Sequence, residues 1–197
     1  MIIQGSNSQT SNIGIIGGTF DPIHRGHLRV IQKLSDNFDK LFVIPSGQPW
    51  LRKHQPTASG ADRFQMCVLA VAELGLGEKV EVLDIEVNKS GPTYSIETIE
   101  ALKKNFPNAK FTLILGADAA SRISQWHRSA ELSKLVSFFV VNRPGTTKSE
   151  FEQVEIDAFD ISATQVRSAV ANGENLSNLI TPSIWNFIKL RKLYGSK

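Results

Sequence analysis

Two histidines follow the first apolar stretch of the chain at a spacing that suits phosphate chemistry. In IGIIGGTFDPIHRGHL, the apolar run leads into Gly17 and Gly18, and His24 and His27 come after a short turn. Side chains three residues apart share one helix face, and the first helical turn offers free amide groups and a positive dipole end. Gly26 leaves room for a flat base or a ribose. The pattern favours a phosphate-binding site, against a metal site or a plain helix cap.

A second polar segment, DISATQVRSAV, stands about 140 residues later in the chain. Ser162 and Gln165 fit a capping box at the start of a helix. Thr164 and Arg167 then project near the same helix end. Hydroxyls, free amides and a guanidinium together suit a polyphosphate tail, while a purely structural cap with a nearby arginine is the alternative.

Alternating strands and helices are expected to position these groups. The expected strands cover residues 12–17, 40–45, 79–87, 110–116, 136–142 and 155–162. The expected helices cover residues 24–38, 61–74, 94–106, 118–135, 163–172 and 182–194. In the second helix, Phe64, Val68, Val71 and Ala72 are expected to face inward. This alternation predicts an α/β fold with a doubly wound, mostly parallel, Rossmann-like sheet and a small C-terminal helical portion.

The loops after the strands are the expected ligand-binding region, because ligands in open α/β sheets sit at the carboxyl ends of strands. These loops are residues 17–27, 46–53, 116–118, 143–145 and 162–167.

Composition narrows the class of protein. The chain has 197 residues, 41% of them hydrophobic, a formal net charge of +3 and one cysteine, Cys67. These values predict a globular domain at residues 13–197, with its helical part at about 162–197, behind a polar tail at residues 1–12. They also favour a cytoplasmic protein without a membrane span, and there is no dense basic block of the kind that binds nucleic acid. A monomer and a homo-oligomer both stay open.

The two polar segments resemble a known superfamily. GTFDPIHRGHL resembles the opening motif of nucleotidyltransferases with a (His/Thr)-x-Gly-His element, and ISATQVR resembles their Ile-Ser-x-Thr-x-x-Arg element. The resemblance implies that His24 and His27 stabilise charge at the α-phosphate of ATP. It also implies that Ser162, Thr164 and Arg167 hold the β- and γ-phosphates, with Arg167 counted beside the histidines as catalytic. It adds further ATP-binding residues, namely Gly17, Gly18, Thr19, Phe20, Gly26 and Ile161.

Shorter segments resemble the bacterial nicotinate-nucleotide adenylyltransferases. SGPTYSIETIEAL resembles their Pro-(Ser/Thr)-Tyr segment, and LILGADAASRISQWHRSAEL their Gly-x-Asp, Trp and Glu-Leu pattern. The resemblance implies that Thr93, Tyr94, Trp126 and His127 bind a pyridine mononucleotide. His127 stands where the family usually has tyrosine. Further implied contacts, to ATP or to phosphate, come from Gly116, Asp118, Arg143 and, in a loop that departs from the family pattern, Lys53 or Arg52.

The resemblance implies adenylyl transfer from ATP to nicotinate mononucleotide, giving nicotinate adenine dinucleotide and pyrophosphate. Mg²⁺ is expected to arrive with ATP, with no protein metal site. Nicotinamide mononucleotide and phosphopantetheine are the alternative acceptors. A non-catalytic nucleotide-binding regulator is disfavoured because both motifs are intact, and an aminoacyl-tRNA synthetase fragment because the chain has no Lys-Met-Ser-Lys-like loop.

Overall fold

A parallel β-sheet forms the centre of the protein. The computed structural model describes residues 11–49, 55–142, 151–156 and 160–196, and within them six strands pair in the order β4-β2-β1-β6-β7-β8. Every pairing in this sheet is parallel. The strands are β1 Asn12–Gly18, β2 Lys40–Pro45, β4 Val80–Val82, β6 Lys110–Gly116, β7 Ser137–Asn142 and β8 Glu152–Glu155. Two short strands, β3 Gln48–Pro49 and β5 Pro92–Thr93, pair separately. The sheet confirms the predicted fold class.

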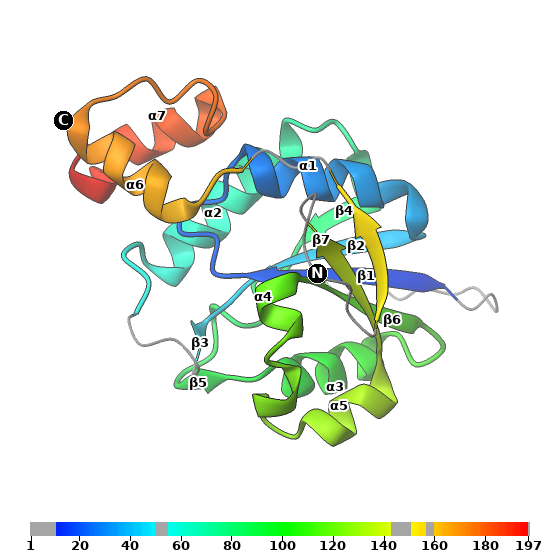
Figure 1. Ribbon diagram of the computed structural model, residues 1–197. Helices are drawn as coiled ribbons and strands as arrows, with labels where there is room; N and C mark the ends of the chain where they lie inside the picture. The colour runs from blue at the N-terminus through cyan, green and yellow to red at the C-terminus, as the bar shows by residue number, and fades with distance from the viewer. Residues whose placement is uncertain (1–10, 50–54, 143–150, 157–159, 197) are drawn as a thin grey trace.

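Helices cover both faces of the sheet (Figure 1). On one side lie α1 Arg25–Leu34 and α2 Gly60–Ala72, and on the other lie α3 Ser95–Asn105 and α5 Ser129–Leu135. The short α4, Ala117–Ala120, follows β6 directly. The remaining helical segments are η1 Ser35–Asn37, η2 Gly77–Lys79, η3 Ile123–Gln125, α6 Ala163–Asn172, α7 Pro182–Leu190 and η4 Leu193–Gly195.

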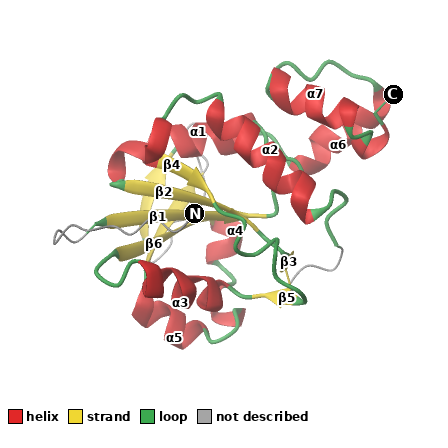
Figure 2. Ribbon diagram, turned by 180° about the vertical axis from the view of Figure 1, so that it is seen from behind, coloured by secondary structure: helices red, strands yellow, loops and turns green. Residues whose placement is uncertain are grey.

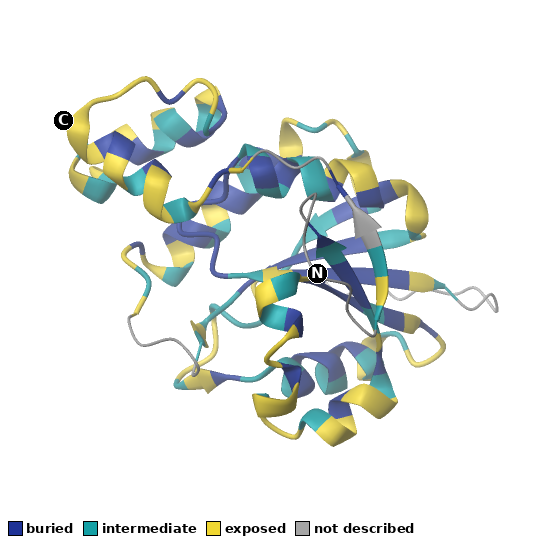
Figure 3. Cartoon of the chain, in the orientation of Figure 1, coloured by how far each residue is buried: buried dark blue, intermediate teal, exposed yellow. Residues whose placement is uncertain are grey.

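Strand side chains alternate between two hydrophobic cores, one on each face of the sheet. Ile16 of β1 packs with Leu28 and Ile31 of α1. Ile13 and Ile15, which point the other way, belong to the core that includes α3. This alternation follows from the two-residue period of a strand. Figure 3 shows that the central strands are buried along most of their length. Burial on both faces explains the long apolar runs of the strands.

The order of the strands places a crevice beside β1. From β1 the chain crosses to β2 on one side, and it later returns through β6 to the other side. The loops that leave β1 and β6 therefore diverge at the carboxyl edge of the sheet. That divergence is the switch point at which open α/β folds bind ligands.

The predicted strands near residues 79–87 and 155–162 were too long or displaced. β4 ends at Val82, because the chain then turns and brings the Glu86 carboxylate back to within 3.4 Å of the Gly47 amide. β8 ends at Glu155, where the second predicted strand was to begin. Residues 157–159 lie outside the described part of the chain. On either side of them, Ile156 and residues 160–162 are not in a strand.

The C-terminal helices pack beside α2, as the view from behind shows (Figure 2). α6 matches its predicted bounds, whereas α7 ends at Leu190 rather than at residue 194. Lys192 and Tyr194 adopt left-handed backbone angles, which a helix does not accommodate. Among the described residues, no helix has the length and apolar character that crossing a membrane requires.

Candidate active site

A cavity of about 450 Å³ opens at the carboxyl ends of β1 and β6. Predicted site residues from four segments meet in its wall: Gly17, Gly18, Thr19, Thr93, Tyr94, Asp118, Trp126 and His127. A β-carbon built on Gly17 would meet no atom within 4 Å, so this glycine borders open space. The backbone at the end of β1 is therefore accessible to a ligand.

The two histidines stack on each other at the start of α1. His24 is the N-cap and His27 the third residue of the helix, and their ring centroids lie 3.7 Å apart. The expectation that they share one face is confirmed, although His24 precedes the helix. Phe20 packs its edge against His27, with 5.0 Å between the ring centroids. Neither histidine is among the residues that line the cavity.

The protonation state of His27 follows from its surroundings. Burial, together with neighbouring His24, holds the pKa of His27 well below its ordinary value, so the ring is neutral at pH 7. The backbone N–H of His24 donates to Nδ1 of His27 over 3.3 Å. A neutral ring that accepts at Nδ1 carries its proton on Nε2. His27 is thus a neutral hydrogen-bond donor through Nε2.

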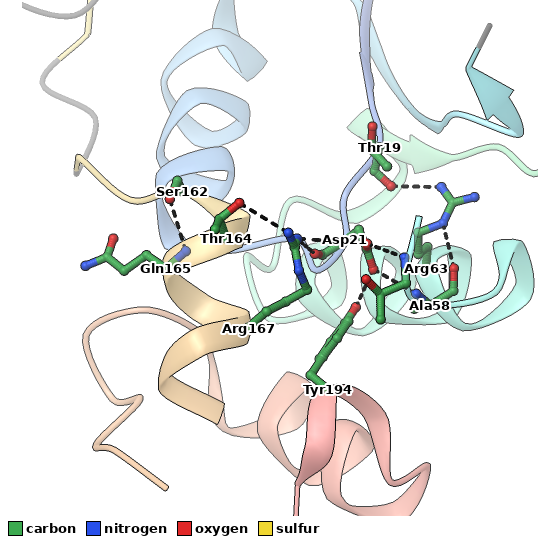
Figure 4. A network of polar contacts seen from close by, with 10 residues as sticks. Thr19, Asp21, Ala58, Arg63, Ser162, Thr164, Gln165, Arg167 and Tyr194 are labelled. Atoms are coloured by element: carbon green, nitrogen blue, oxygen red, sulfur yellow. Dashed lines mark hydrogen bonds and ion pairs between the residues drawn. The ribbon is translucent and has the colours of Figure 1, made fainter. Parts of the chain in front are cut away.

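The start of α6 is tied to the turn between β1 and α1 (Figure 4). Nη1 of Arg167 donates to the carbonyl oxygen of Asp21 over 2.7 Å, and its Nη2 lies 3.2 Å from Oγ1 of Thr164. Ser162 caps the helix, because its hydroxyl accepts from the Gln165 amide over 3.1 Å. The structure therefore brings the two predicted phosphate-binding segments together.

Several predicted ATP-binding residues lie in the protein interior. Phe20 and Ile161 are buried in the hydrophobic core on the α1 side of the sheet. Gly26 is buried within α1. Gly116 is exposed at the end of β6, and a β-carbon there would meet no atom within 4 Å.

Sequence reasoning did not single out Asp21 or Arg63. Both oxygens of the Asp21 carboxylate accept backbone N–H groups, Oδ2 from Thr57 over 2.7 Å and Oδ1 from Ala58 over 3.0 Å. The signal for Asp21 was its place inside the glycine–histidine motif, between Phe20 and Pro22.

Arg63 of α2 is 2% exposed and is surrounded by carbonyl groups. Its guanidinium donates to the backbone oxygens of Thr19 over 2.8 Å, Ser46 over 2.6 Å, Gly47 over 3.2 Å and Ala58 over 3.3 Å. It thereby joins the loops after β1 and β2, two of whose residues, Thr19 and Ser46, line the cavity.

Arg63 also overturns the predicted inward face of α2. Of the four positions expected to face inward, only Val71 is buried, while Ala72 is exposed. The buried face runs through Arg63, Met66, Cys67, Ala70 and Val71. The helix is rotated relative to the expectation because the arginine points into the protein. The signal in the sequence was a set of three- and four-residue steps that links Arg63, Met66, Cys67 and Ala70 on one helix face.

Aromatic rings form the opposite wall of the cavity. The rings of Tyr94 and His127 lie 4.3 Å apart at an angle of 35°, and Trp126 is half-buried beside them. Such a wall suits a flat ring. Arg122 also lines the cavity and was not predicted.

A half-buried carboxyl group lies in the same wall. Burial raises the pKa of Glu86, and the hydrogen bond from the Thr98 hydroxyl opposes that rise. The Thr98 hydroxyl donates to Oε1 of Glu86 over 2.9 Å. Glu86 thus fastens the chain after β4 to α3, directly behind the predicted mononucleotide contact Thr93.

Some predictions fall on residues that are not placed. Lys53, Arg52 and Arg143 lie outside the described residues. Within the described part of the chain, no three His, Cys, Asp or Glu side chains gather closely enough to hold a metal ion.

Comparisons with known proteins agree with this geometry. A family model described as cytidylyltransferase-like matches residues 15–169, which defines the class as a nucleotidyltransferase of that type. A protein of Saccharopolyspora erythraea is 36% identical over 95% of this chain and 91% of its own length, and one of Corynebacterium kroppenstedtii is 33% identical over 92% and 90%. Both are described as probable nicotinate-nucleotide adenylyltransferases. The chain belongs to the nicotinate-nucleotide adenylyltransferase family.

Solved structures share the fold. A Plasmodium falciparum nicotinic acid mononucleotide adenylyltransferase, determined in complex with NaAD, aligns with a TM-score of 0.79 at 21% identity. The alignment covers 95% of this chain and 98% of that one. A putative nicotinate-nucleotide adenylyltransferase from Vibrio parahaemolyticus aligns with a TM-score of 0.72 at 19% identity, over the same shares of both chains.

Proposed function

We propose that the protein transfers the adenylyl group of ATP to nicotinate mononucleotide, producing nicotinate adenine dinucleotide and pyrophosphate. One observation carries the proposal beyond family membership. A single cavity borders both the glycine-rich end of β1 and the aromatic wall of Tyr94, Trp126 and His127. A phosphate-binding strand end and a surface for a flat ring therefore face the same space.

The reaction places modest demands on the protein. A phosphate oxygen of the mononucleotide attacks the α-phosphorus of ATP, the new P–O bond forms, and the bond from the α-phosphorus to the bridging oxygen breaks as pyrophosphate leaves. The nucleophile is already anionic near pH 7, so no general base is required. Rate enhancement then depends on alignment and on neutralising negative charge.

The histidine turn and α6 divide the phosphates between them. His27, a neutral donor through Nε2, and His24 donate to the oxygens of the α-phosphate. Arg167, Ser162 and Thr164 hold the departing pyrophosphate. The link between Arg167 and the Asp21 carbonyl supports this division, because it fixes α6 against the histidine turn. Further ATP contacts come from the end of β1, through Gly17, Gly18, Thr19 and Phe20. Gly26 of α1, Gly116 at the end of β6 and Ile161 before α6 add to them.

The aromatic wall takes the mononucleotide. Trp126 stacks on the pyridine ring, with His127 and Tyr94 at its side, and Thr93 hydrogen-bonds the ligand. Asp118 accepts hydrogen bonds from ribose hydroxyls. Lys53 and Arg143 supply cations to phosphate. Mg²⁺ enters as the counter-ion of ATP, bound to phosphate oxygens, and neutralises part of their charge.

Pyrophosphate release with three acceptors tests the proposal. Purified protein with ATP is given nicotinate mononucleotide, nicotinamide mononucleotide or phosphopantetheine, and kcat/KM is compared. We expect the highest value with nicotinate mononucleotide. A higher kcat/KM with nicotinamide mononucleotide or phosphopantetheine would show that this compound is the acceptor instead. If none of the three gave pyrophosphate release, the proposal of adenylyl transfer itself would be overturned.

A further inference from the structure

The C-terminal end of the described chain reaches back to the histidine turn. The hydroxyl of Tyr194 donates to Oδ1 of Asp21 over 2.7 Å, across 173 residues of sequence (Figure 4). Oδ1 also accepts from the Ala58 amide. Burial and the neighbouring Asp21 carboxylate raise the pKa of Tyr194, so its hydroxyl stays a donor throughout the working pH range. Tyr194 therefore supplies one of the donors that hold this carboxylate in place.

The backbone around Tyr194 is strained to make this contact. Tyr194 has φ 56° and Lys192 has φ 51°, left-handed values that are unfavourable for residues with a side chain. Instead of continuing α7, the chain folds back in η4 and packs against α6. Strain of this kind persists where surrounding contacts impose it, and it gathers at functional sites.

Asp21 also connects this end of the chain to the guanidinium of Arg167. Its carbonyl accepts from Nη1 of Arg167, and its carboxylate oxygen Oδ2 lies 3.9 Å from the same nitrogen. Movement of Asp21 would therefore displace both the turn that leads to His24 and the guanidinium that faces the proposed pyrophosphate position.

We propose that Tyr194 is a positioning residue for the triphosphate half of the active site, acting through Asp21 on Arg167 and the histidine turn. This inference rests on the proposed function for the identity of the two substrates. It makes η4 at the C-terminus, far from the motifs in sequence, a part of the ATP-binding site. Loss of the Tyr194 hydroxyl should therefore weaken the binding of ATP and leave the binding of the mononucleotide unchanged.

Tyr194→Phe is the direct test, because it removes the hydroxyl and keeps the ring. We expect the KM for ATP to rise about three- to tenfold, while the KM for nicotinate mononucleotide stays within twofold. Ser196→Ala is the matched control: it removes a hydroxyl of the same segment, which donates to the Ile188 carbonyl over 3.2 Å and does not reach Asp21. The control is expected to leave both KM values unchanged.

A double-mutant cycle shows whether Tyr194 acts through Asp21. Tyr194→Phe, Asp21→Asn and the double variant are compared by calorimetric binding of the α,β-methylene analogue of ATP. The proposal is supported if the loss of binding free energy in the double variant is clearly smaller than the sum of the two single losses, because either substitution alone already removes the contact. Additive energies overturn it, as does an equal rise in both KM values. Binding of the analogue is read without turnover, so a protein that binds it yet forms no dinucleotide refutes the proposed function and not this inference.

Discussion

The two walls of the active site are built in different ways. The wall at the end of β1 is fixed by hydrogen bonds to backbone groups, with Arg63 beneath Thr19 and with Asp21 bound by the amides of Thr57 and Ala58. The opposite wall consists of ring contacts, such as the 4.3 Å approach of Tyr94 and His127. The first wall is a polar network, and the second is mainly aromatic, with the Glu86 carboxyl group among its residues.

This difference matches the chemistry expected of each half. Charge that develops during phosphoryl transfer is stabilised best by donors that are already in place. A flat ring needs only a stacking surface, and stacking tolerates small displacements. We therefore expect substitutions in the first wall to reduce turnover or stability, and substitutions in the second to weaken binding of one substrate.

The largest expected effect is on His27. His27→Ala should lower turnover by roughly 10² to 10⁴, as removal of a charge-stabilising donor does, with little change in either KM. The measurement is pyrophosphate release at saturating substrates. His127→Ala in the aromatic wall is the control and should mainly raise the KM for the mononucleotide. Near-normal turnover of folded His27→Ala protein would contradict the contrast between the walls.

Arg63 should dominate stability. Arg63→Met keeps the length of the side chain but leaves the buried carbonyl oxygen of Thr19 and the half-buried one of Ser46 without this donor. Each such loss costs about 1–3 kcal/mol, so the free energy of unfolding should fall by about 3 kcal/mol. Urea unfolding measures it. Arg29→Met on α1, where the arginine is only half-buried, should change stability by less than about 0.5 kcal/mol. A loss below 1 kcal/mol in Arg63→Met would show that this buried cation is not needed to hold the loops.

Trp126 should affect one substrate only. Trp126→Leu keeps an apolar side chain but removes the stacking surface, which contributes about 1–3 kcal/mol to a base-like ring. The KM for nicotinate mononucleotide should rise by about 5- to 50-fold, with the KM for ATP within twofold. Initial rates with each substrate varied in turn provide the test. Equal changes in both would mean that the aromatic wall also shapes the ATP half.

The smallest effect concerns pH. The pKa of His27 is lowered in the folded protein, whereas it is near 6.5 when unfolded. Below pH 6.5 the unfolded chain therefore binds a proton that the folded chain does not. The free energy of unfolding should fall as pH drops from about 6.5, by up to about 1.4 kcal/mol per pH unit until the folded pKa is reached, with no contribution above pH 7.5.

His27→Gln isolates this contribution, because glutamine does not titrate. The stability difference between wild type and variant should shift by about 1 kcal/mol between pH 7.5 and 5.5. Parallel pH profiles would indicate that the surroundings of His27 do not lower its pKa in the folded protein.

Most of the correct predictions came from short-range patterns in the sequence. The parallel α/β sheet followed from the alternation of apolar runs and helical spacing, and α6 appears at its predicted bounds. The histidine pair and the Ser162–Arg167 segment were visible because each is a short motif beside a strand end or a helix start. Some errors fell at the ends of elements, such as β4 and α7, where a distant partner decides where an element stops. The predicted inward face of α2 and the strand predicted at residues 155–162 were also wrong.

The sequence by itself determined the class of fold and singled out the two segments that we propose bind the phosphates, because periodicity, capping and short motifs act over a few residues. Only the tertiary structure decided how those side chains are held. The partners of Arg63 are carbonyl groups from three separate segments, and every residue type carries a carbonyl. Tyr194, whose hydroxyl donates to the Asp21 carboxylate, lies 173 residues away from it in the sequence. Any residue type can supply a backbone carbonyl or amide, so the sequence does not reveal contacts to these groups. They become visible only in the folded chain.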